Sequence, residues 1–187
     1  PSHHHRHFFH RNRLLTPPAV KAAREKKESN PLVWIPVSGS ETVPARSKSY
    51  VNYQEIDVVR DVVHVLRARH PEATLAVLTF YKGQFKELSE ATEASLNCEV
   101  LTVDSCQGSE FDYVVLSTVR ANRMGSIGFA VDKQRINVAI SRSILGLIVV
   151  GNDGTMSCCD DWKRVRQSCK TMHRSEWTPS KPVPALG

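Results

Sequence analysis

The stretch "VDSCQGSEFDYVVLSTVRAN", residues 103–122, joins a polar turn to a long apolar run. The run at 112–119 is rich in β-branched and aromatic residues, which is typical of a buried strand. Its polar neighbours in the turn are Asp104, Ser105, Gln107, Gly108 and Glu110. So many polar groups in one short turn between two predicted strands raise the question of a ligand, and this turn is the first candidate site.

Outward from this stretch, apolar runs alternate with segments of helical periodicity. The predicted strands are 31–37, 74–80, 98–103, 112–119 and 144–151. The predicted helices begin at residue 52 and cover 82–96, 132–143 and 159–170. This alternation predicts an α/β fold, with a mostly parallel open sheet and helices on both faces.

The helix after the first strand has a clear start. Asn52 is the expected N-cap, and Glu55 three residues later completes the pattern of a capping box. The apolar residues that share one stripe of this helix are Ile56, Val59, Val63 and Leu66. They predict the face that packs on the sheet.

Composition divides the chain into three parts. Residues 1–30 form a basic lead-in rich in His and Arg, which we expect to be poorly ordered, and residues 171–187 form a Pro-rich tail. The lead-in holds seven Lys or Arg against two Asp or Glu, a net of +5, whereas 31–187 holds eighteen against seventeen, a net of +1. Charge alone therefore does not make the central domain, 31–170, a nucleic-acid binder.

Several protein classes do not fit the sequence. No apolar stretch approaches the roughly 20 residues that span a bilayer, so no membrane partner is expected. The five cysteines form no C-x-x-C pattern, and no metal site is predicted. The chain starts without an apolar signal segment, so we expect a cytoplasmic or nuclear protein with reduced thiols.

Polar clusters follow three of the predicted strands. The first contains Thr79, Tyr81, Lys82 and Gln84; the second is the 103–110 turn; the third is the loop and helix of 128–143. Ligands of open α/β sheets bind at the carboxyl ends of the strands. Loops are polar in any protein, which explains one such cluster, but three at one edge favour a phosphate or polyanion site.

Arg135 and Arg142 belong to the third cluster. They are seven residues apart, which would place them on one helical face about 10.5 Å apart along the axis. Each arginine needs an anionic partner or a route to solvent. That partner is either a carboxylate of the same domain, Asp104 or Glu110, or a phosphate.

Three segments resemble, in order and spacing, motifs IV, V and VI of superfamily 1 helicases. They are "TFYKGQ" (79–84), "VDSCQGSEFDYVVLSTVRAN" (103–122) and "GFAVDKQRINVAISRSILGLIVVGN" (128–152). The resemblance is greatest to the group of the nonsense-mediated-decay helicase and senataxin. It implies the second of two RecA-like motor domains, with ATP in the cleft between the two domains and single-stranded RNA or DNA running across both.

The resemblance also implies roles for individual residues. Arg142 matches the arginine finger, which neutralises charge on the γ-phosphate. The residues implied at the nucleotide are Gln107, Gly108, Glu110 and Arg135. The residues implied at the strand are Thr79, Tyr81, Ser105 and Asn122. Cys106 stands where the family often has an aromatic residue, and we expect it to be a small packed hydrophobe.

Other helicase motifs do not occur in these 187 residues. The sequence contains no G-x-x-x-x-G-K-[ST] phosphate loop and no Asp-Glu pair to hold Mg²⁺. By the resemblance, ATP and Mg²⁺ would bind only with a first RecA-like domain, supplied in cis or in trans. The isolated chain is therefore expected neither to hydrolyse ATP nor to unwind duplexes.

Two other readings stay open. The chain could be a non-catalytic module, derived from a helicase, that binds nucleic acid or protein, or it could be an unrelated α/β domain. Arg142 separates a motor half from a binding module, because only a motor half needs the arginine finger.

Overall fold

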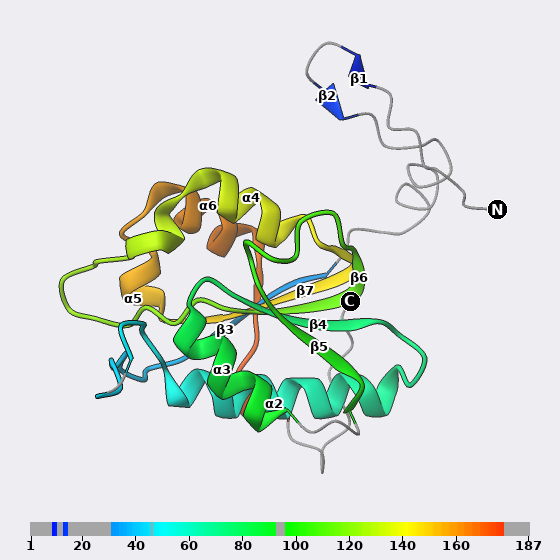
Figure 1. The fold of residues 1–187 in the computed structure, drawn as a ribbon, viewed down its shortest axis with the longest axis horizontal. Coiled ribbons are helices and arrows are strands. Elements are labelled where there is room, and N and C mark those ends of the chain that lie inside the picture. Colours follow the sequence, from blue (N-terminus) through cyan, green and yellow to red (C-terminus); the bar gives the residue numbers. More distant parts are fainter. Residues whose placement is uncertain (1–8, 11–12, 15–30, 46, 93–95, 178–187) are drawn as a thin grey trace. The chain divides into compact units, whose positions relative to one another are not determined.

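The computed structural model describes residues 9–10, 13–14, 31–45, 47–92 and 96–177 (Figure 1). The chain divides into two compact units, 1–30 and 31–187. In the first unit the described residues form an antiparallel pair of short strands, β1 (Phe9–His10) and β2 (Arg13–Leu14). The rest of the predicted lead-in lies outside the described residues.

The second unit is built on a six-stranded sheet in which every pairing is parallel. Its strands are β3 (Leu32–Pro36), β4 (Leu75–Thr79), β5 (Cys98–Thr102), β6 (Phe111–Ser117), β7 (Ser143–Gly151) and β8 (Lys170–Thr171). Their order across the sheet is β5-β4-β6-β7-β3-β8. The five predicted strands are confirmed, each to within two residues, and β8 is the additional edge strand.

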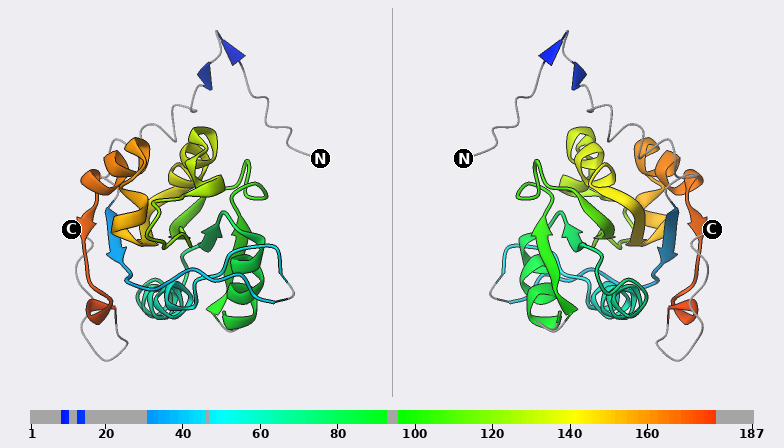
Figure 2. Two further views of the ribbon diagram at one scale, coloured as in Figure 1. Left: turned by 90° about the vertical axis from the view of Figure 1, so that its left-hand side faces the viewer. Right: turned by 90° about the vertical axis from the view of Figure 1, so that its right-hand side faces the viewer.

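Helices cover both faces of this sheet, as predicted (Figure 2). They are α2 (Tyr53–Arg69), α3 (Lys82–Ala91), α4 (Lys133–Ile140), α5 (Asp153–Met156) and α6 (Asp160–Ser168), with two 3₁₀ turns, η2 (Gly128–Val131) and η3 (Arg174–Glu176). Helices α2 and α3 pack on one face, and α4, α5 and α6 pack on the other. No described helix is both long and apolar enough to cross a bilayer.

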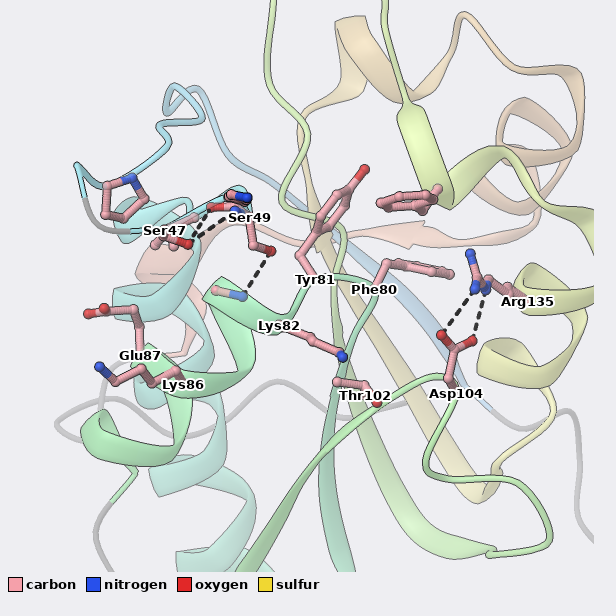
Figure 3. A pocket seen from close by; sticks show the side chains of 15 residues that line it. Ser47, Ser49, Phe80, Tyr81, Lys82, Lys86, Glu87, Thr102, Asp104 and Arg135 are labelled. Carbon is pink, nitrogen blue, oxygen red and sulfur yellow. Dashed lines mark hydrogen bonds and ion pairs between the residues drawn. The ribbon is translucent and has the colours of Figure 1, made fainter.

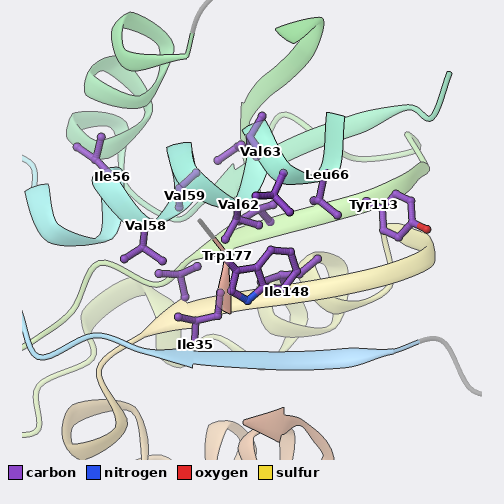
Figure 4. Packing of buried hydrophobic residues seen from close by; sticks show 14 of the residues in the cluster. Ile35, Ile56, Val58, Val59, Val62, Val63, Leu66, Tyr113, Ile148 and Trp177 are labelled. Atoms are coloured by element: carbon purple, nitrogen blue, oxygen red, sulfur yellow. The ribbon is translucent and has the colours of Figure 1, made fainter. Parts of the chain in front are cut away.

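The core explains why the strands read as continuous apolar runs. Along β7, Ile148 and Val150 face the α2 side, whereas Leu147 and Val149 face the α4 side. All five residues of β4 are buried, because side chains on both faces meet a helix layer. The predicted stripe of α2 lies on the sheet, with the apolar residues Ile56, Val59, Val63 and Leu66 (Figure 4).

The start of α2 confirms one prediction and corrects another. Asn52 is the N-cap, because its side chain accepts a hydrogen bond from the Glu55 amide at 3.2 Å. The capping box is wrong. The Asn52 amide donates to Gln84 Oε1 at 2.8 Å, and the Glu55 carboxylate turns into the core, where it accepts from the Ser117 hydroxyl at the end of β6 and from the Val119 amide just after it.

The C-terminal boundary predicted at residue 170 falls inside β8. Beyond it, Met172 and Trp177 are buried in the same core cluster as α2. Residues 171–177 therefore pack on the sheet, and the remainder of the predicted tail, 178–187, lies outside the described residues.

Candidate functional site

A groove of about 860 Å³ opens at the carboxyl ends of β4 and β5 (Figure 3). It is lined by residues 44, 47–49 and 51, the first turns of α3, the end of β5, η2 and the start of α4. Its lining residues are Pro44, Ser47, Lys48, Ser49, Val51, Phe80, Tyr81, Lys82, Gly83, Lys86, Glu87, Thr102, Asp104, Phe129 and Arg135. Residues of all three predicted polar clusters therefore meet here, among them Lys82, Asp104 and Arg135.

The charge of the groove favours an anion. Three lysines line it, at 48, 82 and 86, together with Arg135. Arg135 forms a two-pronged ion pair with Asp104, with Nε–Oδ1 at 2.8 Å and Nη2–Oδ2 at 3.0 Å. The carboxylate partner expected for Arg135 is thus confirmed as Asp104, and the lysines remain in excess over Glu87.

The first polar cluster is mostly buried beneath the groove. The side chain of Thr79 is inaccessible to solvent, and Tyr81 is 3% exposed. The Tyr81 hydroxyl donates to the Ile127 carbonyl at 2.9 Å, and burial raises the pKa of this phenol. Lys82 is the exposed member of the cluster, and Figure 3 shows it projecting from the start of α3 toward Thr102.

A buried polar network supports the groove from below. The Glu55 carboxylate is inaccessible to solvent and accepts hydrogen bonds from the Ser117 hydroxyl at 2.6 Å and the Val119 amide at 2.9 Å. Gln84 donates to Ser117 Oγ at 2.9 Å and to the Asn52 carbonyl at 3.2 Å. Desolvation by burial outweighs these bonds and raises the pKa of Glu55 to about 7.

A second network holds the loop after β6. Arg120 donates through Nε and Nη2 to both oxygens of Glu41, at 2.9 and 3.0 Å. Glu41 also accepts from the Ala121 amide at 2.7 Å and from the Asn122 side chain at 3.0 Å. Burial alone would raise the pKa of Glu41, but the bonds from Arg120 and its neighbours lower it. Asn122, which was predicted to contact single-stranded nucleic acid, therefore braces this loop.

The 103–110 turn presents three of the four residues that the sequence predicted at the nucleotide, whereas the fourth, Arg135, lies on α4 and lines the groove. Gln107, Gly108 and Glu110 are exposed, and Gly108 has a φ of 87°, which favours glycine. Ser105 is exposed as well, and its hydroxyl donates to the Thr102 carbonyl at 3.0 Å. Cys106 is fully buried, as expected of a packed hydrophobe, and burial raises the pKa of its thiol.

Arg142 lies at the amino ends of the parallel strands, just before β7, whereas the groove lies at their carboxyl ends. Its guanidinium donates to the carbonyls of Val138 and Ser109, each at 3.1 Å, and to Ser141 Oγ at 2.9 Å. The prediction that Arg135 and Arg142 share a helical face is wrong. Helix α4 ends at Ile140, because the Arg142 carbonyl already accepts the Phe111 amide in the ladder between β6 and β7.

The 103–110 turn connects these two places. Parallel pairing with β4 puts the end of β5 at one edge of the sheet and the start of β6 at the other, so the turn crosses between the edges. Near its start, Asp104 holds Arg135 beside the groove, and near its end Ser109 holds Arg142. One short segment thus contacts both arginines.

Sequence reasoning missed several residues of the groove. Ser47, Lys48 and Ser49 come from a loop that carries no recognisable pattern, and they reach the groove only through the fold. Phe129 lines the groove too and is 64% exposed. An aromatic residue next to glycines in a polar loop is the signal that could have identified it.

The fold indicates the class of domain. The C-terminal domain of a possible DNA helicase from Lactobacillus plantarum is similar in structure, with a TM-score of 0.51 and 14% sequence identity. The similarity covers 84% of this chain and 96% of that one. Together with the all-parallel sheet, it confirms the predicted α/β fold of RecA-like type.

The family follows from the sequence comparison. Residues 3–154 match the AAA domain family AAA_12, and the chain belongs to that family. "Probable helicase MAGATAMA 3" of Arabidopsis thaliana is 34% identical over 151 residues, 75% of this chain and 18% of the relative. "Regulator of nonsense transcripts 1" of Dictyostelium discoideum is 34% identical over 137 residues, 68% and 10% of the two chains.

"Probable helicase senataxin" of Homo sapiens is 32% identical over 130 residues, 65% of this chain and 5% of the relative. These relatives confirm the resemblance to the nonsense-mediated-decay and senataxin group. The chain corresponds to less than a fifth of the length of each of the three relatives.

Proposed function

We propose that this chain is the C-terminal motor domain of an ATP-dependent helicase that acts on RNA or DNA. It supplies Arg142 as the arginine finger, together with part of the groove for a single strand. A first RecA-like domain, in cis or in trans, supplies the phosphate loop and the acid that holds Mg²⁺. On this proposal the isolated chain does not hydrolyse ATP.

The course of the 103–110 turn carries the proposal. A motor must couple the state of a nucleotide to its hold on a strand, and coupling needs an element that touches both sites. This turn is bonded to Arg135 beside the basic groove and to Arg142 at the far edge of the sheet. A shift of the turn at one end is therefore felt at the other.

Arg142 and the 103–110 turn can supply one part of a nucleotide site, and the first RecA-like domain would supply the rest. The hydrogen bonds of Arg142 to Val138, Ser109 and Ser141 use three of its five N–H donors, which leaves the outer N–H groups for a phosphate oxygen. Gln107, Gly108 and Glu110 add exposed polar groups beside it, at the turn. When bound, ATP and Mg²⁺ would supply the phosphoryl group and its counter-charge.

On the strand side, the groove residues fit a phosphodiester backbone. Lys82, Lys86 and Lys48 offer ammonium groups, and Ser105 is exposed at the neighbouring turn. Thr79, Tyr81 and Asn122 were predicted to contact the strand, but they are buried or bonded within the domain. We therefore propose that they shape the groove while the lysines contact the phosphates.

To test the hypothesis that the chain is a motor domain, it is fused to a first RecA-like domain from a relative. Arg142→Ala should abolish ATPase activity stimulated by single-stranded nucleic acid, and it should leave binding of the nucleic acid largely intact, because the groove lies at the other ends of the β-strands. Arg164→Ala is the matched control. It is an exposed arginine on α6 that pairs with Asp161 at 3.3 Å, and ATPase activity should survive its loss.

The alternative is a binding module without chemistry. The same groove supports it, since basic residues bind a strand whether or not ATP is hydrolysed nearby. If the joined protein binds single strands with normal salt dependence and Arg142→Ala changes neither binding nor ATPase activity, the binding module is correct and the motor reading is not.

We further propose that the protein works in the cytoplasm or nucleus. All five cysteines are free thiols in the structure, although two of them are neighbours in sequence. Free thiols suit a reducing compartment. Fractionation of the source cells with an antibody to residues 100–150 tests this proposal, and the same blot gives the size of the endogenous protein.

A further inference from the structure

Phe129 is an exposed aromatic residue in a domain that buries most of its apolar side chains. Among the described residues, the large hydrophobic side chains that are exposed are Val43, Tyr53, Met124, Phe129 and Val131. Phe129 is the one of these that lines the groove. An exposed ring at a basic groove invites a functional explanation, because water contact is costly for a phenyl group.

The ring is held on a firmly anchored turn. On one side of it Ile127 is 6% exposed, and its carbonyl accepts the Tyr81 hydroxyl at 2.9 Å. On the other side Ala130 is fully buried, and its carbonyl accepts the indole N–H of Trp162 at 2.7 Å. The turn is fixed at both flanks while the ring between them stays 64% exposed, so the fold presents Phe129 to a ligand.

The neighbours of the ring are suited to a nucleobase. The guanidinium carbon of Arg135 lies 5.6 Å from the Phe129 ring centroid, and the Tyr81 ring lies 6.1 Å away at a tilt of 46°. The same groove carries Lys82 and Lys86. Proteins that bind single strands combine a basic track for phosphates with aromatic rings on which bases stack.

We propose that Phe129 stacks against a base of the single strand at the mouth of the groove, while the lysines hold the adjacent phosphates. The inference rests on the proposed function, because it assumes that the groove takes a strand. The inference specifies which part of the nucleic acid Phe129 contacts, namely the face of a base. Every base has such a face, so little sequence preference is expected.

A protein partner is the competing occupant, since Met124 and Val131 are exposed in the same segment. Charge decides between the two. The groove around Phe129 is bordered by Lys48, Lys82 and Lys86, and an apolar protein surface would cover these ammonium groups without offering them an anion. A strand satisfies both the ring and the lysines.

The first experiment measures binding of labelled oligo(dT) and oligo(U) to the full chain by fluorescence anisotropy. Phe129→Ala should weaken binding by about 5- to 140-fold, the range for loss of one stacked base. A strand of the same length with abasic sites keeps the phosphates and should bind wild type and variant equally. Lys82→Ala should weaken the binding of both strands, and it should reduce the slope of log affinity against log salt concentration by about one.

Met124→Ala is the matched control, because Met124 is 89% exposed in the same segment and does not line the groove. It should bind like wild type. Phe129→Trp gives a direct signal, since Trp34, Trp162 and Trp177 are fully buried and the new indole is the exposed one among the described residues. Oligo(dT) should quench its fluorescence, and the abasic strand should not.

The outcomes separate this inference from the proposed function. If wild type binds neither strand in a salt-dependent manner, the strand part of the proposed function fails and stacking fails with it. If wild type binds both strands and Phe129→Ala changes neither affinity, the groove binds phosphates alone, and the stacking role is overturned. Loss of binding to the first RecA-like domain, with strand affinity intact, would assign Phe129 to a protein contact instead.

Discussion

The Glu55 carboxylate holds Val119 in a conformation that valine rarely adopts. Val119 has a φ of 71°, and its amide donates to Glu55 Oε2 at 2.9 Å while its carbonyl accepts the Asn52 side chain at 3.1 Å. A β-branched residue at positive φ costs free energy, so the surrounding bonds must enforce it. Two side chains at the start of α2 thus fix the loop that follows β6.

The raised pKa of Glu55 makes stability depend on pH. Between pH 4.5 and about 7 the folded state keeps a proton that the unfolded state has lost, so the folded state loses stability as pH rises through this window. At about 1.4 kcal/mol per pKa unit, the effect reaches about 3 kcal/mol above pH 7. Glu55→Gln removes this titration and its contribution.

Urea unfolding of wild type and Glu55→Gln at pH 5, 6, 7 and 8 checks the prediction. The free energy of unfolding of wild type, relative to the variant, should fall from pH 5 to pH 7 and then level off. A difference that stays constant across this range would show that Glu55 does not titrate in the folded protein.

The ion pair between Arg120 and Glu41 is a second target. Their side chains are 4% and 12% exposed, so removal of one partner leaves a charge that is largely buried. Glu41→Gln or Arg120→Met should each lower the free energy of unfolding by about 3–5 kcal/mol. The double variant should lose less than the sum, because it leaves neither charge alone.

Asp57→Ala provides the control for this prediction. Asp57 pairs with Arg60 at 3.1 Å on the surface, where the two side chains are 47% and 44% exposed. Its loss should cost at most about 1 kcal/mol. Equal costs for the buried and the surface variants, measured by urea unfolding, would contradict the assigned burial of Arg120.

Sequence periodicity identified the sheet and its helices because burial on both faces leaves a strong apolar signal. It placed Asn52 as an N-cap correctly, because that bond is local. It failed where a long-range partner competes: Glu55 was assigned to the cap, and the two shortest bonds of its carboxylate come from residues more than sixty positions away. Arg142 failed for a similar reason, since the start of β7 ends the helix.

The candidate site was predicted to the extent that its residues follow strands. Lys82 and Asp104 were found because the carboxyl ends of parallel strands meet. Thr79 follows the same rule, but sequence does not say which side of a strand end is covered, and its side chain is buried. Lys48 sits in a loop whose path only the folded chain determines.

The cysteines should react with an alkylating agent in an order set by burial. Cys158 is exposed, whereas burial raises the pKa of Cys169 to about 11 and that of Cys98 to about 12. At pH 8 a thiol with a pKa of about 12 is ionised in about one molecule in ten thousand. Cys158 should therefore be alkylated first, and Cys98 and Cys169 far more slowly.

Timed iodoacetamide labelling of the full chain, followed by peptide mass spectrometry, measures this order. In guanidinium chloride the five thiols should react at similar rates, because unfolding removes the burial. Early labelling of Cys98 in the native chain would contradict the burial that raises the pKa of its thiol.

The last prediction concerns Gly128, which begins the turn that carries Phe129. Gly128 has a φ of 58°, and a Cβ there would meet the Arg120 guanidinium and lie 2.8 Å from the Tyr81 hydroxyl. Gly128→Ala therefore adds a steric clash to the cost of a left-handed alanine. Gly108 separates these two costs, because its φ is 87° but no atom lies within 4 Å of a Cβ built there.

Gly108→Ala should lower the free energy of unfolding by about 1–2 kcal/mol, the conformational cost alone. Gly128→Ala should lose a further 1–3 kcal/mol, approximately, because the buried hydroxyl and guanidinium must move apart. Urea unfolding of both variants tests the difference. If the two alanines cost the same, the turn yields without strain, and Phe129 is not held as rigidly as its buried flanks imply. If Gly128→Ala costs more, the close contacts of Gly128 with Arg120 and Tyr81 also fix the position of the exposed Phe129 ring.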